Sequence, residues 1–221
     1  MRNGVRPTLP RGRAGAFAQR LVIMVKEPVA GRVKTRLARD IGTVRATAFF
    51  RENMRSTTAR LDRDQRWQTI LAVAPEAATK SRMLIGGGAR MPPLMPQGGG
   101  DLGARLTRIA RHAPAGPLVI IGADIPGIHA ADIASAFAAL RAGDAVFGPS
   151  SDGGYWLIGL KARARRAKGA FANVRWSTAF AFSDTRANVS QLKVSEITVK
   201  DDVDDGDDFE RLSPLIGRRV R

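Results

Sequence analysis

A glycine and three cations near the start of the chain form the first segment whose composition suggests chemistry. The segment is KEPVAGRVKTRL (26–37), in which Gly31 precedes Arg32, Lys34 and Arg36. It is not a Walker phosphate loop, because Arg32 follows Gly31 where that motif needs a lysine and no glycine stands five residues earlier. It also lacks the G-x-G-x-x-G dinucleotide fingerprint. A glycine permits close backbone approach and cations can neutralise a diphosphate. Phosphate binding and a solvated basic turn both fit this segment.

Three glycines followed by an aspartate form the second segment, QGGGDLGARL (97–106). Asp101 is placed to cap the helix that the following residues predict, which would make the segment a flexible turn with a helix start. Alternatively, the bare backbone around Gly98 could lie against a flat ring or a ribose, with Gln97 or Asp101 reading its edge.

Asp124 follows a strongly apolar run in the third segment, LVIIGADIPGI (118–128), and Pro126-Gly127 then turns the chain. A carboxylate at the end of a central strand is well placed to hold Mg²⁺ or Mn²⁺ that bridges a nucleotide diphosphate. A turn stabilised by the aspartate is the alternative. The apolar strand favours the metal role, because solvent exposure does not readily explain an acid at this position.

The fourth segment, FGPSSDGGYWLIGL (147–160), places Asp152 before Gly153, Gly154 and Tyr155. The two glycines allow a substrate to approach closely, and Asp152 could be a second metal ligand, a base or an acceptor for a hydroxyl group. A hairpin with an Asp-Gly turn is also compatible with this sequence.

The elements that must position these segments are apolar strands alternating with amphipathic helices. Strands are predicted at 21–25, 69–74, 118–123, 144–148 and 155–160, and helices at 101–113 and 131–143. Such a pattern predicts a mostly parallel α/β sheet with helices on both faces, whose ligands sit at the carboxyl ends of the strands. The acidic run KDDVDDGDDFERL (200–212) is interpreted as a solvated turn that precedes a short final helix.

Composition narrows the class of protein further. The chain has 221 residues with 44% hydrophobic residues, no cysteine and a net charge of +16, as expected for a single globular domain without disulfides or thiolate chemistry. We predict a disordered basic extension over 1–20 and one domain over 21–221. Neither a membrane-spanning run nor a secretory signal is evident, so the expected location is the cytoplasm. Aromatic residues make up only 6%, which argues against a dedicated nucleic-acid binder despite the charge.

In this order, the four segments and VRWSTAFAFSDT (174–185) resemble the signature blocks of the radical-SAM/selenodomain-associated transferases, also described as arsenosugar-biosynthesis glycosyltransferases. The resemblance covers about residues 20–212. It implies a Rossmann-like GT-A fold of the nucleotide-diphospho-sugar transferase superfamily.

The resemblance also implies roles for particular residues. The Gly31–Arg36 loop would meet the nucleotide phosphates, with Lys34 and Arg36 foremost, and Asp124 would bind the metal. The residues that would face the acceptor or the transferred group are Asp152, Gly153, Gly154, Tyr155 and Trp176. GT-A enzymes typically carry a D-x-D pair, whereas here Asp124 is followed by Ile125, so metal binding could need Asp152 as a partner or be weak.

Three functions remain open at this stage. The first is a metal-assisted transferase with a nucleotide-activated donor, most simply a glycosyltransferase that uses a nucleotide sugar and Mg²⁺ or Mn²⁺, in which Asp124 and Asp152 are catalytic. The second is a nucleotidyltransferase that takes an NTP and releases pyrophosphate. The third is a non-catalytic protein that binds nucleotides or nucleic acid, as the charge suggests. The acceptor and the oligomeric state are not predicted.

Overall fold

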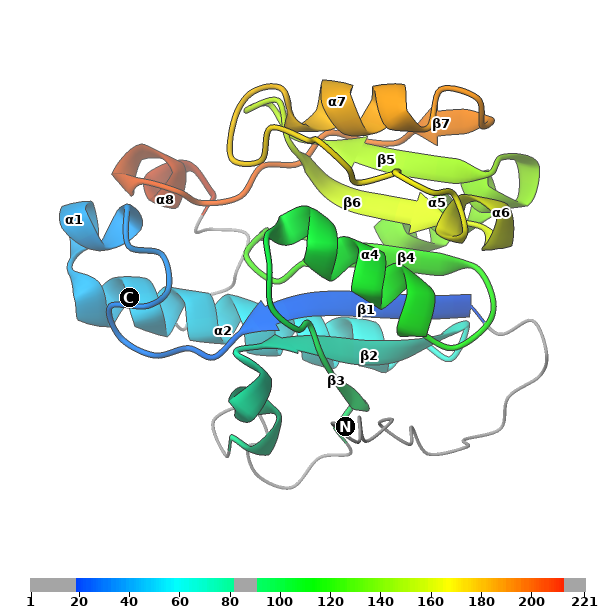
Figure 1. Cartoon of the computed structure of the whole chain (residues 1–221). Coiled ribbons are helices and arrows are strands. Elements are labelled where there is room, and N and C mark those ends of the chain that lie inside the picture. The colour runs from blue at the N-terminus through cyan, green and yellow to red at the C-terminus, as the bar shows by residue number, and fades with distance from the viewer. Residues whose placement is uncertain (1–18, 82–90, 213–221) are drawn as a thin grey trace, which may run out of the picture.

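A seven-stranded sheet forms the centre of the fold in the computed structural model, which describes residues 19–81 and 91–212 (Figure 1). Its strands are β1 (Gln19–Lys26), β2 (Trp67–Ala74), β3 (Leu94–Pro96), β4 (Leu118–Gly122), β5 (Ala145–Pro149), β6 (Tyr155–Leu160) and β7 (Val194–Glu196). Their order is β3-β2-β1-β4-β6-β5-β7, and β6 alone in this sheet runs antiparallel to its neighbours. The prediction of a mostly parallel α/β sheet is therefore confirmed.

Helices cover both faces of this sheet. They are α1 (Leu37–Ile41), α2 (Thr43–Asp62), η1 (Glu76–Lys80), α4 (Leu102–His112), α5 (Ala130–Ala142), α6 (Ala162–Arg165), α7 (Ala181–Asn188) and α8 (Gly206–Leu212). Side chains of α2 and α5 belong to the core on one face, and those of α4, α6 and α7 pack on the other. Figure 1 shows α4 and α7 in front of the strands and α2 and α5 behind them.

The apolar strands are explained by burial on both faces. Along β1, Leu21 and Ile23 point into the core under α2 and α5, while Val22, between them, points into the core under α4. All three side chains are fully buried. A strand with a core on each side needs apolar residues at every position, because successive side chains point to opposite faces.

Most of the predicted elements occur where the sequence places them. All five predicted strands are present, and α4 and α5 match the two predicted helices, with Asp101 capping α4 by accepting a hydrogen bond from the Ala104 amide at 2.8 Å. The two three-residue strands β3 and β7 were not predicted. β1 begins at Gln19, and the division into a basic extension over 1–20 and a domain over 21–221 stays a prediction. Residues 1–18 and 213–221 lie outside the described residues.

The acidic run differs most from its prediction. Its first part belongs to an extended segment, residues 197–205, which we call the C-terminal strap, and the final helix α8 lies within the run rather than after it. The strap is fixed along β5 by hydrogen bonds from the Ile197 amide to the Phe147 carbonyl (2.8 Å) and from the Lys200 amide to the Pro149 carbonyl (3.1 Å). It then leads to α8, which packs beside α1 (Figure 1). A solvated turn is therefore the wrong interpretation.

A small apolar cluster anchors the strap and α8. Val203, in the middle of the acidic run, is fully buried against Leu37 and Phe49, and Phe209 of α8 packs edge-on against the Phe49 ring at 5.2 Å. The cluster fixes the far end of the strap near the loop that follows β1.

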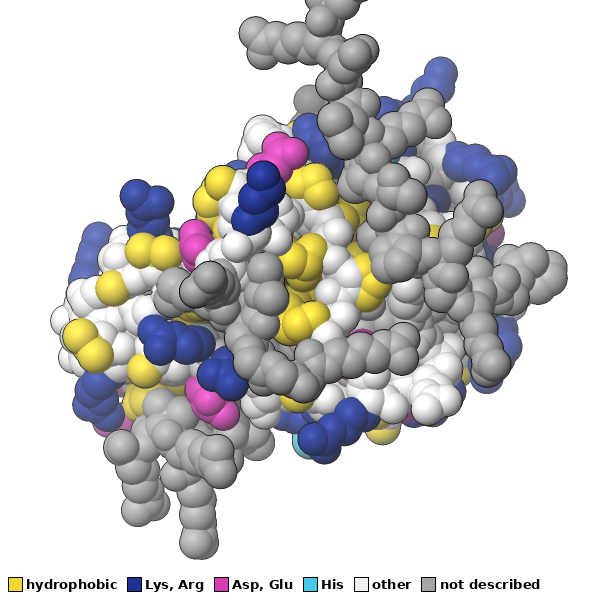
Figure 2. All heavy atoms as spheres, turned by 90° about the horizontal axis from the view of Figure 1, so that it is seen from below, with side chains coloured by type: hydrophobic (Ala, Val, Ile, Leu, Met, Phe, Trp, Pro, Cys, Tyr) yellow, Lys and Arg dark blue, Asp and Glu magenta, His cyan; other side chains and the backbone are white. Residues whose placement is uncertain are grey.

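Basic side chains are dispersed over one face of the molecule (Figure 2). In Figure 2 the Lys and Arg side chains of the described residues lie apart around the face that is shown, with apolar side chains between them. Within the ranges that the structure describes, no helix combines the length and apolar character that crossing a bilayer requires.

Removing the Phe209 ring should loosen the strap. We expect Phe209→Ala to lower the free energy of unfolding by about 3 kcal/mol, because a large core side chain is lost. Val199→Ala, on the same strap but at a side chain that is 54% exposed, should change it by less than about 0.5 kcal/mol. Urea denaturation measures both variants, and equal effects would contradict the packing of α8.

Candidate functional site

A cavity of about 820 Å³ opens at one edge of the sheet. The carboxyl ends of β1, β3, β4 and β5 and the amino end of β6 meet there, as the strand directions require. This volume lies within the range of roughly 300–1,000 Å³ found for small-molecule sites, and the position is the one expected for ligands of open α/β sheets.

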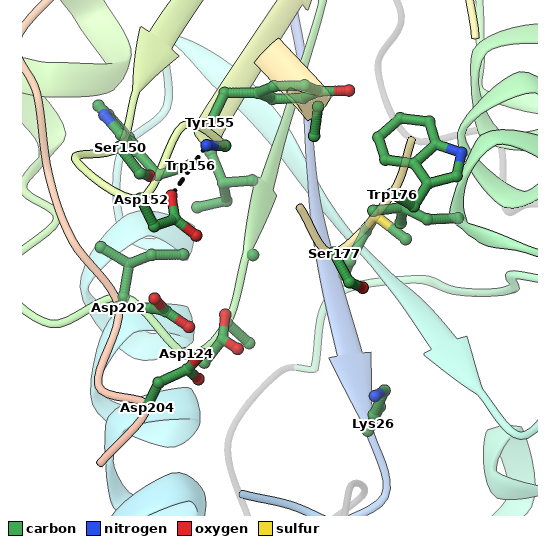
Figure 3. Close-up of a pocket in the computed structure, with 18 of the residues that line it drawn as sticks. Lys26, Asp124, Ser150, Asp152, Tyr155, Trp156, Trp176, Ser177, Asp202 and Asp204 are labelled. Carbon is green, nitrogen blue, oxygen red and sulfur yellow. Dashed lines mark hydrogen bonds between the residues drawn. The ribbon is translucent and has the colours of Figure 1, made fainter. Parts of the chain in front are cut away.

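The ammonium group of Lys34 is the centre of this site. Its Nζ lies 3.1 Å from Asp124, 3.0 Å from Asp202 and 3.2 Å from Asp204, and the lysine side chain is only 6% exposed. We call these four residues the Lys34 cluster. Figure 3 shows the carboxylates of Asp124, Asp202 and Asp204 together on one side of the pocket. The cluster joins the loop after β1, the end of β4 and the C-terminal strap.

The charge state of Lys34 follows from this environment. Burial alone would lower the pKa of the ammonium, but attraction to Asp124, Asp202 and Asp204 outweighs burial and raises the pKa above its ordinary value. The Lys34 backbone has a φ of 45°, a left-handed conformation that costs a non-glycine residue about 1–2 kcal/mol. Buried Val33 and Leu37 flank it and hold the loop in place. Strain at a residue that is held this firmly often marks a functional site.

Asp202 and Asp204 are functional candidates that the sequence interpretation missed. They flank buried Val203 on an extended segment, and alternation along such a segment turns both acids to the same side. Asp-Val-Asp is itself a D-x-D pair, which is absent after β4 and occurs instead in the strap. A lone apolar residue inside an acidic run is the signal that could have revealed it.

The carboxyl groups of this pair titrate differently. Burial and the nearby charges of Asp124 and Asp204 raise the pKa of Asp202 to about 6, against the attraction of Lys34. Burial would also raise the pKa of Asp204, but the attraction of Lys34, a hydrogen bond with Asp202 and the charge of Arg36 outweigh burial and hold that pKa below its usual range.

Buried and half-buried hydrogen bonds fix the turn that carries Asp124. Asn53 of α2, 1% exposed, donates to the Ala123 carbonyl at 2.9 Å. Beyond the turn, the Arg60 guanidinium donates to the Ile128 carbonyl at 2.6 Å, and the Lys200 ammonium donates to the Gly127 carbonyl at 3.3 Å. The acid is therefore held in the cavity by α2 and by the strap.

The three carboxylates of the Lys34 cluster are suited to bind a hard divalent cation. In this structure they form ion pairs with the Lys34 ammonium. Within the described residues, no group of three or more His, Cys, Asp or Glu side chains is arranged to hold a metal ion as it stands. Carboxylate oxygens are nevertheless the ligands that Mg²⁺ and Mn²⁺ prefer, and three of them converge on one cation. Asp152 lies in the same pocket but forms no part of this cluster.

The predicted phosphate-binding residues divide into two groups. Lys34 and Arg36 line the cavity, and Arg36, 70% exposed, pairs with Asp204 at 3.1 Å. Gly31 and Arg32 are exposed and are not among the lining residues. Two cations that the sequence interpretation did not single out, Lys26 and Arg105, line the cavity as well.

The glycine segment after β3 forms part of the scaffold. The Gln97 side chain is buried and donates to the carbonyls of Val25 (3.0 Å) and Ala72 (2.8 Å), although the residue lines the cavity. Gly98 has a φ of 73°, and the Arg108 guanidinium occupies the space that its side chain would need. Asp101 is the cap of α4 and is not among the lining residues.

A tight turn holds Asp152 on the side of the pocket that also carries Asp124, Asp202 and Asp204 (Figure 3). Asp152 Oδ1 accepts a hydrogen bond from the Gly154 amide at 2.8 Å, as the dashed line in Figure 3 shows. Gly153 has a φ of 83°, and an added Cβ there would collide with the backbone of Ala179. Its carbonyl accepts from the Phe182 amide at 2.9 Å. The glycine therefore allows the turn to pack against the loop before α7.

Aromatic residues form one wall of the cavity. Tyr155 and Trp176 line it with ring centroids 6.4 Å apart, and Ser177 beside them has a left-handed φ of 60°. Burial raises the pKa of the Tyr155 hydroxyl, which lies 3.5 Å from the Thr185 hydroxyl. Arg175, next to Trp176, pairs with Asp184 of α7 at 2.8 Å.

A pH titration should detect the raised pKa of Asp202. Its folded-state pKa of about 6 lies above the ordinary value of 3.8, so the folded protein holds this proton more tightly than the unfolded chain. The resulting stability is fully present below about pH 4 and is lost as the pH rises through about 6. We expect the ¹³C carboxyl signal of Asp202 to titrate near pH 6 in EDTA. The unfolding free energy of the wild type relative to Asp202→Asn should rise from pH 7 to pH 5, and titration at the ordinary value would contradict this.

Gly153 should tolerate no side chain. In Gly153→Ala the new Cβ would strain the backbone and collide with the backbone of Ala179. Gly169→Ala is the control, because Gly169 also has a positive φ (80°) but its new Cβ would meet only Ala172, at 3.9 Å. We expect the control to lower the free energy of unfolding by about 1–2 kcal/mol. Gly153→Ala should lower it by about 1–3 kcal/mol more, as chemical denaturation can measure. Indistinguishable losses would show that the turn does not pack as described.

Several solved protein structures are similar in fold to this chain. No curated protein matches the sequence. A provisionally described nucleotide-diphospho-sugar transferase from Desulfovibrio desulfuricans G20 is similar in structure, with a TM-score of 0.77 and 26% identity over 86% of this chain and 83% of the other. The 4-diphosphocytidyl-2C-methyl-D-erythritol synthase of Anaerococcus prevotii DSM 20548 has a TM-score of 0.58 and 10% identity, with coverage of 92% and 100%.

A third similar structure is Rv0371c of Mycobacterium tuberculosis H37Rv in complex with manganese, with a TM-score of 0.52 and 19% identity over 92% of this chain and 100% of the other. These structures establish a GT-A-like fold. A protein family described as "Uncharacterized protein conserved in bacteria (DUF2064)" matches residues 57–178, more than half of the sequence. The chain belongs to this family.

Proposed function

We propose that this protein is a metal-assisted transferase whose donor is a nucleotide-activated small molecule, and specifically a nucleotide sugar. The observation that carries the proposal is the Lys34 cluster, which joins a cationic loop to Asp124 at the carboxyl ends of the strands. The similarity to a provisionally described nucleotide-diphospho-sugar transferase supports the choice of donor.

The cations of the cavity suit a diphosphate. Arg36 is exposed at the rim, and Lys26 lies at the end of β1 with no ion pair within the described residues. Arg105 lines the cavity from α4 and uses its Nε on the Gly100 carbonyl at 3.0 Å, which leaves its terminal nitrogens for a ligand. These groups can offset the charge of a bound diphosphate.

The residues that would hold a divalent cation are Asp124, Asp202 and Asp204. When bound, Mg²⁺ or Mn²⁺ would stabilise the negative charge that develops on the leaving diphosphate. The manganese complex of the similar Rv0371c structure supports this choice of metal. With both acids of the strap available, Asp152 is not needed as a metal ligand.

Asp152 is then free for the acceptor. Its carboxylate lines the cavity and uses one oxygen on the Gly154 amide, so the other oxygen can orient an acceptor hydroxyl or take its proton. Tyr155 and Trp176 offer an apolar wall against which a sugar ring or an acceptor can pack.

A nucleotidyltransferase is the second candidate, favoured by the similarity of the fold to a cytidylyl-type synthase. In that reaction the cavity would bind an NTP and pyrophosphate would leave. Two further points stay predictions from the sequence. They are membership of the radical-SAM/selenodomain-associated transferases and location in the cytoplasm.

A donor screen separates the two reactions. The protein is incubated with Mn²⁺ and either nucleotide sugars or NTPs, donors that stabilise it in a thermal shift are selected, and the released product is identified. Nucleoside diphosphate from a nucleotide sugar supports the proposal, and pyrophosphate from an NTP selects the second candidate. Absence of Mn²⁺-dependent stabilisation by every nucleotide would overturn both.

Asp124→Asn should reduce turnover of the selected donor by about 100-fold or more, because charge stabilisation at the leaving group is lost. Asp101→Asn is the matched control, since it makes the same change at a helix cap outside the cavity, where asparagine caps as well as aspartate. The control should keep wild-type activity. Equal losses in both variants would contradict the role of Asp124.

A further inference from the structure

Lys34 holds a position that the proposed chemistry assigns to a metal ion. All three carboxylates suited to a divalent cation lie within 3.0–3.2 Å of the Lys34 ammonium, which is enclosed by them. Hydrogen bonds from Nζ reach Asp202 and Asp204 in addition to the ion pair with Asp124. The ammonium already neutralises part of the charge that a metal would neutralise.

We propose that Lys34 is a built-in counter-ion that competes directly with a divalent cation for Asp124, Asp202 and Asp204. Metal binding must then displace the ammonium from the three carboxylates. The inference rests on the proposed function for the identity of the metal, and it adds a residue that controls metal affinity.

The enclosure of Lys34 supports displacement as a discrete event. A metal ion bound to the same carboxylate oxygens would lie beside the Lys34 ammonium, whose side chain is only 6% exposed, and the two cations would repel each other in this partly buried site. The three carboxylates without the ammonium would also repel one another in a half-buried site. Either the ammonium or a metal ion therefore offsets the repulsion among the three carboxylates.

The position of Lys34 on the loop after β1 allows the displaced ammonium to contact a ligand in the same cavity. Lys34 belongs to the turn that bears exposed Arg36, and both residues line the cavity. A lysine has a long flexible side chain, so the ammonium can leave the acids and reach a phosphate in the same cavity. A lysine released by metal would thus serve the donor, and metal and donor would bind with positive coupling.

Metal affinity of the protein without nucleotide tests the competition. Mn²⁺ binding is measured by electron paramagnetic resonance of the free ion for the wild type and for Lys34→Met, which keeps the length of the side chain and removes its charge. We expect Lys34→Met to bind Mn²⁺ about tenfold or more tightly than the wild type, because the competing cation is gone.

Lys26→Met is the matched control. It removes one positive charge from the same cavity, at a lysine with no carboxylate partner within the described residues. A general change in the field of the cavity would tighten Mn²⁺ binding in both variants alike, whereas direct competition tightens it in Lys34→Met alone. Equal affinities of the wild type and Lys34→Met, or equal gains in both variants, would overturn the inference.

A second measurement uses the wild type and does not depend on the folding of a variant. Acetylation by an N-hydroxysuccinimide ester, mapped by mass spectrometry, reports how accessible each ammonium group is. We expect Lys34 to be protected in EDTA and to become at least about as reactive as an exposed lysine at saturating Mn²⁺, while Lys26 keeps its reactivity. Protection of Lys34 that persists at saturating Mn²⁺ would contradict displacement.

These tests are separable from that of the proposed function, because neither uses a nucleotide. Mn²⁺ that displaces Lys34 in a protein that no nucleotide stabilises would leave the competition intact and overturn the donor. Turnover of a donor by a protein in which Mn²⁺ leaves Lys34 protected would support the proposed function and overturn the competition.

Discussion

The attraction between one buried ammonium and three carboxylates is the constraint on which the site depends. Lys34 comes from the loop after β1, Asp124 from the end of β4, and Asp202 and Asp204 from a strap near the end of the described chain. No pair of these elements is adjacent in sequence, and the ion pairs hold all three at the same edge of the sheet. Partial burial of the cluster makes each charge dependent on the others, because an unpaired charge there is costly.

The rest of the fold serves this arrangement. A sheet buried on both faces brings the carboxyl ends of β1 and β4 side by side, and Asn53 of α2 holds the turn before Asp124. The apolar cluster of Val203, Phe49 and Phe209 anchors the strap that supplies the other two acids. Scaffold and site are thus linked through a few buried contacts, and the remaining cavity is left open to a ligand.

The sequence was sufficient for the parts of the fold that depend on local pattern. Continuous apolar runs predicted the central strands, and helical spacing with Asp101 as a cap predicted α4, because both signals lie within a few residues of each other. The strands β3 and β7 were missed because three residues are too few to show a period. Beside the glycines, Gln97 is compatible with a ligand-reading role in the sequence, whereas in the structure its amide nitrogen donates to the backbone carbonyls of two strands, a contact that no local pattern encodes.

The site itself was only half predictable. Asp124 stood out because it follows an apolar strand, and Lys34 because it belongs to a glycine-containing loop with three cations. Their pairing could not be foreseen, since it depends on three-dimensional proximity. Asp202 and Asp204 lay in a run whose composition is typical of solvated turns, and only buried Val203 distinguishes it. Long-range charge pairing of this kind overrides composition, which is why Lys34 is enclosed by acids although its sequence context indicates a phosphate ligand.

A crystal structure of the protein with Mn²⁺ and inorganic pyrophosphate tests the central claim most directly, because it does not require the base of the donor to be known. The account predicts a manganese ion bound by Asp124 with Asp202 or Asp204, and the Lys34 ammonium moved from these carboxylates to a phosphate oxygen. A structure in which pyrophosphate and Mn²⁺ occupy the cavity while Lys34 still contacts all three acids would contradict it.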